Sequence, residues 1–373
     1  KKMVFRKVAH LVLLSGVSFY FLSTSFCFAA NQPKVETEKL VAYPNIKPFA
    51  YTQLWAVNDR TPGSTYGEDY QIARGRVGAK GYLTPNIDYM VLTEWGHLSY
   101  KYPVTLLDLW INYKVNPGFN IKLGQTWYKF TLSGATTIMT IPFVYRPEII
   151  DAIWLKMGRN GSYGYDKGIE VWGDFKKARF PWSYVFFLTT GTGLSRFQDH
   201  GLDNLSGRFT IEPLKGLMFG VSGYYGYSRT EINSNLGSEE KKNLPEYAYG
   251  VDISYNHKYF RIITEALQSL YEGRIDLSGS EIFSIATNKQ RGWYAMLGLK
   301  PLSWIEIPVQ YAWYESNYVN SDTGLKTITV GLTWTLKEKT LNNIKVNYLI
   351  RSAQKNYGSK PRNKFIVQLQ LFF

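Results

Sequence analysis

The chain has 373 residues, a formal net charge of +14 and a single cysteine, so intrachain disulfides are excluded. After residue 29 no run of 18 or more apolar residues occurs, which argues against a membrane-spanning helix. The 29 Tyr and 11 Trp residues suit the two aromatic girdles of a lipid-facing barrel better than one soluble core.

The first residues have the features of a secretory signal peptide. Four cations precede a mostly apolar run, and small residues follow near Ala29. We therefore expect residues 1–29 to be a signal peptide cleaved after Ala29 and excluded from the fold. A lipoprotein signal acylated at Cys27 is disfavoured because the bulky Phe26 precedes it. The mature chain then has a charge near +10, and residues 30–45 are expected to be a polar periplasmic lead-in.

Segments of about ten residues with alternating apolar and polar side chains follow one another from about residue 46 to the end. This two-residue period is typical of strands with one apolar and one polar face. In the last segment Phe365, Val367 and Leu369 alternate with Ile366 and Gln368. Sixteen strands are predicted, at 46–57, 70–82, 87–97, 104–115, 118–128, 162–174, 182–190, 204–212, 216–227, 246–256, 258–269, 290–300, 303–314, 324–336, 341–352 and 364–373.

The connections between these strands alternate in length. Short turns such as Pro85-Asn86 follow the even strands, and long polar loops, for example 190–203, 229–245 and 270–289, follow odd ones. This pattern is typical of outer-membrane barrels with both termini in the periplasm. Closure leaves no unpaired backbone in lipid, and sixteen strands can enclose a water-filled channel. We therefore predict an all-β fold for residues 46–373, a transmembrane antiparallel β-barrel of about 16 strands in the outer membrane of a Gram-negative-type bacterium.

Residues 129–159 have no strand-like alternation and lie between the fifth and sixth predicted strands. A connection of this length without regular structure is uncommon and is usually functional. The stretch is too apolar for a surface loop, and it carries isolated charges at Arg146, Glu148, Asp151 and Lys156. We predict that this long third extracellular loop folds into the lumen and narrows it.

Several stretches carry a family resemblance. They are ARGRVGAKGYL at 73–83, LLDLWINYKVNPGFNIKLGQ at 106–125, Tyr145-Arg146-Pro147 in the long connection, DKGIEVWG at 166–173 and the final strand ending in Phe373. Together they resemble the family of phosphate-selective porins O and P, mainly over the N-terminal half. The resemblance implies a homotrimer of sixteen-stranded barrels, each with the third loop inside and basic residues that guide anions. Recognition of the C-terminal strand by the barrel-assembly machinery is also expected.

Strand parity places many charged side chains on the face opposite the apolar one. In the second strand Arg74, Arg76 and Lys80 share this face, on which residues two apart lie about 7 Å from each other, whereas Ala73 takes the other face. The candidate residues for the pore wall and constriction are Arg74, Arg76, Lys80, Lys122, Arg146, Glu148, Asp151, Arg208 and Arg261. The same parity turns Lys114, Lys345 and Arg351 inward.

Acidic side chains nearly balance these cations. By the same parity Asp88, Glu94, Asp108, Glu170, Glu212, Asp252, Glu265 and Glu306 point inward. A phosphate site requires several cations that converge without acids between them. Two questions therefore stay open. The cations of the second strand either guide anions or pair with Glu94 or Asp88 on the next strand, and Arg146 either lines the constriction or anchors the loop to the wall through an acid such as Glu170.

Sites of other kinds have weak support. The glycine-rich run at 158–164 is not followed by a helix, so a phosphate-binding loop is disfavoured. The mature chain has three histidines, His97, His200 and His257, without a recognisable catalytic or metal-binding pattern around them. No cofactor, metal or nucleic-acid partner is expected. The aromatic residues Tyr225, Tyr227, Trp313, Trp334 and Tyr348 have lipid-facing parity, which favours a girdle over a sugar slide.

These features favour a porin in the outer-membrane lipid that passes small hydrophilic solutes by diffusion, with a mild preference for anions, phosphate among them. Two alternatives come from other classes. One is a barrel hydrolase acting on lipid or peptide, for which Asp199-His200 is the nearest acid–base pair. The other is an adhesin barrel that mainly displays its loops. Steady channel conductance in planar bilayers separates the porin from both.

Overall fold

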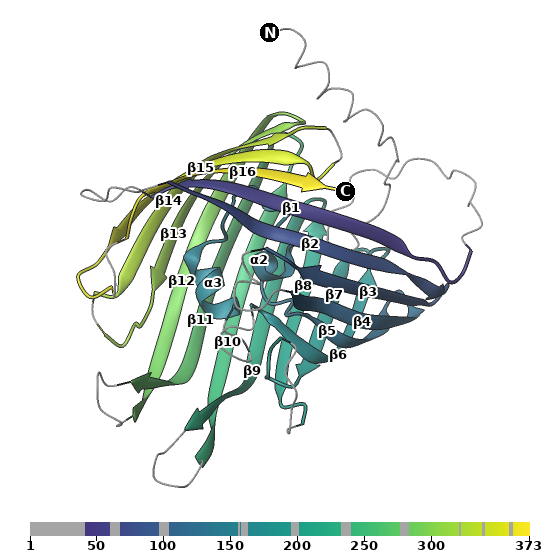
Figure 1. The fold of residues 1–373 in the computed structure, drawn as a ribbon, viewed down its shortest axis with the longest axis horizontal. Helices are drawn as coiled ribbons and strands as arrows, with labels where there is room; N and C mark the ends of the chain where they lie inside the picture. Colours follow the sequence, from purple (N-terminus) through teal and green to yellow (C-terminus); the bar gives the residue numbers. More distant parts are fainter. Residues whose placement is uncertain are drawn as a thin grey trace. The chain divides into compact units, whose positions relative to one another are not determined.

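Sixteen strands form one closed antiparallel barrel in which consecutive strands pair and β1 closes the ring on β16 (Figure 1). The computed structural model describes residues 42–59, 68–96, 104–155, 157, 163–194, 201–232, 240–276, 283–320, 322–337, 340–357 and 361–373. The predicted barrel of sixteen antiparallel strands is confirmed. The predicted signal peptide at 1–29 and most of the predicted lead-in lie outside the described residues.

The strands are β1 Lys47–Asn58, β2 Glu68–Thr84, β3 Ile87–Glu94, β4 Thr105–Asn116, β5 Phe119–Trp127, β6 Tyr165–Phe175, β7 Trp182–Thr189, β8 Asn204–Leu214, β9 Leu217–Ile232, β10 Glu240–Asn256, β11 Phe260–Asp276, β12 Phe283–Leu302, β13 Ile305–Glu315, β14 Gly324–Thr335, β15 Asn343–Ala353 and β16 Lys364–Phe372. Between β5 and β6 lie two short helices, α2 Leu132–Ala135 and α3 Glu148–Trp154. None of the helices in the described ranges has the length and apolarity needed to traverse a bilayer.

The strands β9 to β12 run further than their alternation predicts, with 16, 17, 17 and 20 residues. The predicted loops at 229–245 and 270–289 are therefore wrong at both ends. Backbone pairing continues through polar rungs such as Lys241 opposite Glu231. Ladder hydrogen bonds join backbone groups whatever the side chains are, and alternation disappears where both faces of a strand meet water.

The two faces of the barrel differ as the alternation predicts. On the outer face, Leu109, Ile111 and Val251 expose 49%, 52% and 55% of their surface. On the inner face, Gln53 and Glu94 are fully buried. An apolar outer surface with polar groups inside is the arrangement that a lipid environment requires of a barrel.

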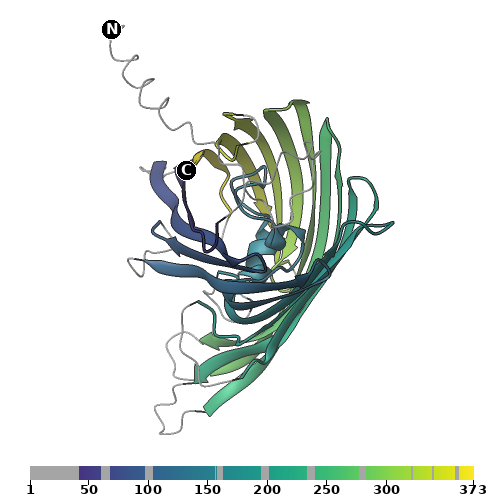
Figure 2. The ribbon, with the colours of Figure 1, turned by 90° about the vertical axis from the view of Figure 1, so that its right-hand side faces the viewer.

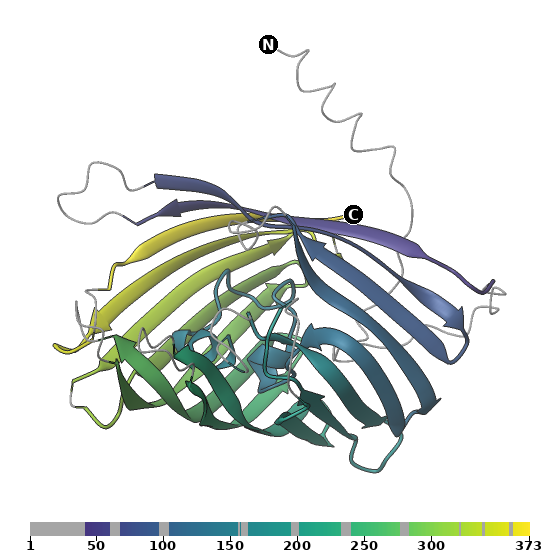
Figure 3. The same ribbon diagram turned by 60° about the horizontal axis from the view of Figure 1, so that its bottom comes forward.

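The connection between β5 and β6, residues 128–155 (the inner segment), packs inside the barrel against strands on more than one side of the interior. Figures 2 and 3 show α2 and α3 inside the curve of the strands. The buried apolar residues of the segment form a core with inward-facing wall residues, namely Tyr128, Phe130, Phe143, Ile149, Ile150, Ile153 and Trp154 with Phe187, Tyr224, Ala248, Leu267, Tyr294, Met296, Ala312, Tyr314 and Leu325. The strands β7 to β14 thus share an apolar core with the inner segment.

A β-bulge changes the parity of β2. Gln53 pairs with Arg74 and Leu54 pairs with Ile72, so Ala73 is an extra residue without a partner on β1. Ala73 is buried in a cluster with Val144 of the inner segment. The prediction that Ala73 faces away from Arg74 is wrong, because a bulge inserts one residue and shifts the alternation that follows it.

Two adjacent inward-facing glycines allow close contact between strands. Gly124 and Gly168 are direct partners on β5 and β6. A Cβ atom on Gly168 would lie 1.9 Å from the Leu188 carbonyl oxygen, which belongs to the backbone of β7. By contrast, a Cβ atom on Gly223 of β9 would meet nothing within 4 Å.

We predict that Gly168→Ala lowers the free energy of unfolding by about 1–3 kcal/mol or more, since overpacking against backbone forces the strands apart. Gly223→Ala is the matched control and should change it by less than about 0.5 kcal/mol. Urea unfolding of the refolded protein in detergent micelles measures both. Equal midpoints for the two variants would contradict the close approach of β6 and β7.

Candidate functional site

Hydrogen bonds tie α2 to strands on the far side of the barrel from β5. The Thr131 amide donates to Ser222 Oγ at 2.9 Å. The amide and hydroxyl of Ser133 donate to Glu265 Oε1 at 2.9 and 2.5 Å, and the Tyr294 hydroxyl donates to the same oxygen. Hydrogen bonds to a charged acceptor are stronger than neutral ones, so Glu265 is the main attachment of α2.

The backbone is strained where the inner segment enters α2. Thr131 has φ 59° and ψ 172°, a conformation that costs a β-branched residue about 1–3 kcal/mol. Its amide is held by Ser222, and its hydroxyl accepts a hydrogen bond from the Gly134 amide at 3.3 Å. The wall therefore imposes the position of α2 against a local strain.

Side chains of β15 and β16 hold the stretch between the two helices. Lys345 Nζ donates to the Ile141 carbonyl at 2.7 Å, and the Gln370 amide donates to the Met139 carbonyl at 3.2 Å. Lys345 is 1% exposed, and no described carboxylate lies within 4 Å of it. Its charge is satisfied by backbone carbonyls of the inner segment.

The orientation of α3 is set at both of its ends. Glu148 forms an ion pair with Arg351 at 3.0 Å and accepts a hydrogen bond from Thr327. The Trp154 indole donates to the Tyr128 carbonyl at 2.8 Å. With its apolar side in the core, helical periodicity leaves Asp151 on the opposite face.

The cations of β2 stand beside the aromatic residues of β1. From guanidinium or ammonium to ring centre, the distances are 5.5 Å for Arg74 over Trp55, 5.4 Å for Arg76 over Tyr51 and 5.3 Å for Lys80 over Phe49. Such cation–π contacts hold the long side chains against the wall.

Among these cations, Arg76 and Arg74 differ in their partners. Arg76 forms an ion pair with Glu94 at 2.6 Å, which is one of the two alternatives drawn from the sequence. Arg74 donates to Gln53 Oε1 at 2.6 Å, and no carboxylate of the described residues lies within 4 Å of it. Arg74 thus brings a positive charge to the interior without a neutralising partner.

Three other candidate cations are neutralised by acids on the next strand or the next but one in the ring. The pairs are Lys122 with Glu170, Arg208 with Asp252 at 2.5 Å, and Arg261 with Glu306 at 2.5 Å. A buried charge is tolerated when it is paired and hydrogen-bonded. These residues stiffen the wall and add little net charge to it.

Arg146 binds within the inner segment itself. Its Nε donates to the Ser133 carbonyl at 3.0 Å and its Nη2 to the Thr136 carbonyl at 2.8 Å, and its guanidinium lies 4.9 Å from the Trp154 ring centre. Glu170, the acid named as an example of an anchor for Arg146, pairs with Lys122 instead. Desolvation lowers the pKa of Arg146, but a guanidinium stays charged at any working pH.

Asp151 is partly exposed and lacks an ion-pair partner within 4 Å among the described residues. Desolvation raises the pKa of its carboxyl to about 6, while the positive charges of Arg146 and Arg74 act in the opposite direction. The negative charge of Glu148 adds to the rise. Asp151 is therefore ionised at neutral pH and becomes neutral in mildly acidic solution.

Lys129 is not among the pore residues predicted from the sequence, but it also lies in the inner segment. Its ammonium donates to the Trp127 carbonyl at 3.1 Å and lies over the Trp127 ring. Desolvation lowers the pKa of Lys129 to about 7, against the influence of the nearby acids Glu170 and Asp108. The sequence signal is a lone cation between aromatic residues, which indicates burial.

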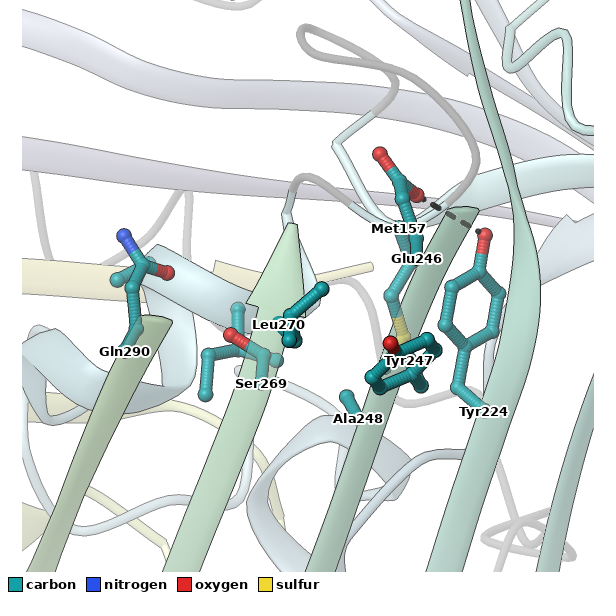
Figure 4. A pocket seen from close by; sticks show the side chains of 10 residues that line it. Met157, Tyr224, Glu246, Tyr247, Ala248, Ser269, Leu270 and Gln290 are labelled. Carbon is teal, nitrogen blue, oxygen red and sulfur yellow. Dashed lines mark hydrogen bonds between the residues drawn. The ribbon is translucent and has the colours of Figure 1, made fainter. Parts of the chain in front are cut away.

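The hollow shown in Figure 4 lies on the apolar side of the interior, between the end of α3 and strands β9 to β12. It is small, with a volume of about 30 Å³, and Ala152, Ile153 and Met157 line it on one side. Tyr224 donates to Glu246 across its edge at 3.4 Å. None of the candidate cations lines it.

The remaining sequence candidates have no structural support as sites. Lys156, Arg159, His97 and the Asp199-His200 pair lie outside the described residues. His257 lies in the turn after β10, against the rings of nearby aromatic residues. Over the described ranges, no cluster of three or more His, Cys, Asp or Glu side chains is arranged to bind a metal ion.

Comparisons with known proteins show a likeness in fold only. No protein-family model matches the chain, and no curated protein matches it. A solved structure of Salmonella typhi OmpF in complex with daunomycin aligns with a TM-score of 0.61 at 10% identity, covering 88% of this chain and 97% of that one. An anion-selective porin from Comamonas acidovorans aligns at 0.60 with 12% identity, covering 88% and 99%. The outer-membrane channel DcaP of Acinetobacter baumannii aligns at 0.58 with 11% identity, covering 88% and 97%. The chain therefore has the barrel fold of solved outer-membrane channels.

We predict that Glu265→Gln loosens α2, because a neutral acceptor binds Ser133 and Tyr294 less strongly. A loss of about 1–2 kcal/mol should lower hydrogen-exchange protection of the α2 amides about 5–30-fold, with the strands unchanged.

Hydrogen exchange of the refolded barrel, followed by mass spectrometry of peptides that span α2, makes this measurement. Glu315→Gln is the control, since Glu315 pairs with the partly exposed Arg291 on the neighbouring strand. Unchanged protection in Glu265→Gln would show that Glu265 does not hold α2.

Proposed function

We propose that residues 46–373 form an outer-membrane porin that passes small hydrophilic solutes by diffusion. The observation that carries the proposal is the closed barrel with an apolar outer face and charged residues inside. The similar solved structures, which include an anion-selective porin and an outer-membrane channel, support it. Export by the signal peptide at 1–29 and insertion in a Gram-negative-type outer membrane are parts of this proposal.

The proposed route runs between β1–β6 and the polar side of the inner segment, which narrows it. The apolar core that α3 forms with strands β7 to β14 occupies part of the interior on that side. Arg74 and Arg76 on the wall and Arg146 and Asp151 on the segment then face the passing solute. Narrowing of the channel is the role that the sequence analysis predicts for the third extracellular loop.

A mild anion preference follows from the charges near this route. Arg74, Arg146 and Lys129 lack an ion-pair partner within 4 Å among the described residues, whereas Glu94 is paired with Arg76. Two acids without an ion-pair partner among the described residues, Asp151 on α3 and Asp108 on β4, stand near these cations, so strict phosphate selection is not part of the proposal. Phosphate remains a candidate solute on the family resemblance alone.

A homotrimer is proposed as the assembled form. The support is the family resemblance and the similar structure of Vibrio cholerae OmpT, which is described as a trimer form. That structure aligns with a TM-score of 0.59 at 10% identity over 88% of this chain.

We predict steady open channels in planar bilayers and a reversal potential in a KCl gradient that favours chloride. Arg74→Gln should reduce the chloride-to-potassium permeability ratio about two- to fivefold, since one exposed charge is worth about 0.2–1 kcal/mol. Arg291→Gln removes an equal charge from a pair with Glu315 and should leave the ratio unchanged.

Absence of channels in the wild-type protein would reject the porin and favour the hydrolase or adhesin alternatives. Preference for potassium would reject the anion preference alone.

We predict that chloride preference rises as the pH is lowered from 8 to 5. Lys129 gains a proton near its pKa of about 7, and Asp151 loses its negative charge near its pKa of about 6. Both changes make the route more positive on acidification. In Asp151→Asn the step near pH 6 should disappear while the step near pH 7 remains. Reversal potentials at half-unit pH intervals test this, and an unchanged step in the variant would contradict the assignment.

A further inference from the structure

A stack of aromatic rings lies on the outer face of the barrel, where β6 ends and β7 begins. Phe175 and Trp182 are direct partners across the two strands, and their rings stack with centres 3.9 Å apart. The ring centres of Tyr184 on β7 and Phe209 on β8 lie 6.1 and 5.7 Å from that of Trp182. These residues form the aromatic stack, and outer-membrane barrels place such rings where lipid chains meet water.

The turn between these two strands, residues 176–181, is strongly basic. Lys176, Lys177 and Arg179 all lie in it, and all three residues are exposed to solvent. The turn closes directly onto the aromatic stack, since the Ala178 amide donates to the Phe175 carbonyl at 3.1 Å. Its cations therefore stand immediately beyond the rings, at the end of the strands where the lipid-facing surface meets water.

The surroundings of this basic turn neutralise little of its charge. Lys176 Nζ lies 3.2 Å from an Asp174 carboxylate oxygen, but 77% of the Lys176 side chain stays exposed. Neither Lys177 nor Arg179 has an ion-pair partner within 4 Å among the described residues, and the Arg179 guanidinium lies 5.3 Å from the Phe180 ring centre. Three exposed cations against one acid leave the turn with a net positive charge.

The other short turns that the structure describes in full carry less charge. The turns 85–86, 117–118 and 303–304 hold no charged residue. The turns 215–216 and 257–259 hold one lysine each. The aromatic stack thus lies beside the most basic of these turns, so the combination of rings and cations belongs to this place in the ring and not to the rim as a whole.

One class of ligand fits both halves of this site. Rings on a lipid-facing surface pack against acyl chains, and exposed Lys and Arg side chains bind phosphate oxygens by charge-assisted hydrogen bonds. A glycerophospholipid with an anionic head group offers both, whereas a zwitterionic lipid carries its own cation next to the phosphate. Short turns are the periplasmic connections of an outer-membrane barrel, so lipids of the periplasmic leaflet reach this site.

We propose that the aromatic stack and the basic turn bind an anionic glycerophospholipid of the periplasmic leaflet, with its acyl chains on the rings and its phosphate at Lys176, Lys177 and Arg179. Clusters of cations beside a membrane attract anionic lipids in this way. The site lies on the outer face of the barrel, so it is separate from the proposed solute route.

Native mass spectrometry of the refolded barrel in detergent tests the proposal with phosphatidylglycerol and phosphatidylcholine of identical acyl chains. Both lipids carry the phosphate, but only phosphatidylglycerol is anionic overall. The first molecule of phosphatidylglycerol should bind at least about tenfold more tightly than the first molecule of phosphatidylcholine, since each cation near anionic head groups contributes about fivefold. Raising the ionic strength should reduce this ratio, because salt screens exposed charges.

Two sets of substitutions in the basic turn test its role. Lys176→Gln, Lys177→Gln and Arg179→Gln combined should lower the ratio of the two binding constants to about two or less. The charge-preserving pair Lys176→Arg and Lys177→Arg should keep the ratio of the wild-type protein, since either side chain supplies the positive charge.

A matched control removes three exposed cations from the opposite rim, namely Lys326→Gln, Lys355→Gln and Arg362→Gln. This control has the same net charge as the triple variant of the basic turn, and it should keep the wild-type ratio. Heat-modifiable mobility and strand circular dichroism show that each variant is folded.

A soluble head group separates lipid binding from the binding of small anions. Glycerophosphoglycerol lacks acyl chains and should fail to displace phosphatidylglycerol at millimolar concentration, because it cannot contact the rings. Displacement would show a site for small anions and overturn the proposal. Equal binding of the two lipids to the wild-type barrel, or an unchanged ratio in the folded triple variant of the basic turn, would overturn it as well. The porin stands or falls separately, by its conductance.

Discussion

Backbone groups inside a closed barrel need hydrogen-bond partners, and the structure of the interior depends on how the wall supplies them to the inner segment. Lys345 and Gln370 donate to its carbonyl groups, and Ser222 and Glu265 accept from its amides. These four residues come from strands on different parts of the ring. With its backbone satisfied in this way, the segment can bury the apolar face of α3 against the wall, and one side of the barrel becomes a packed core.

In the rest of the interior, many charged side chains form ion pairs with one another. Most cations of the wall are held by acids on strands close by in the ring, as Lys122 is by Glu170, so they contribute rigidity and little net field. The charged groups without an ion-pair partner among the described residues include Arg74 on β2, Arg146 and Asp151 on the inner segment, and Lys345 and Glu265, which bind the inner segment from β15 and β11. In the proposed porin, a solute meets Arg74 and Asp151, whose positions are fixed by aromatic stacking and by a helix. The proposed selectivity is then a property of a small region, while the paired charges maintain the shape of that region.

Much of the fold could be predicted from the sequence, and less of the candidate site. All sixteen strands follow from the alternation of side chains, most of them to within a few residues. The helices α2 and α3, with four and seven residues, are too short to show a helical period. The inward orientation of the Ala73 side chain was not predictable, because a bulge depends on the register of the neighbouring strand. The partner of Arg146 was not predictable either, since its acceptors are backbone carbonyls that α2 presents only when folded.

The sequence by itself determined the barrel, its strand number and the two chemically different faces, because alternation along a strand is a local property that each segment carries alone. Only the tertiary structure decided which charges are neutralised and which remain available. The partners that decide this are distant in the chain: Lys345 and Ile141 are 204 residues apart, and Glu148 meets Arg351 across the interior. Such pairings depend on closure of the ring and on the path of the inner segment, which side-chain periodicity does not encode.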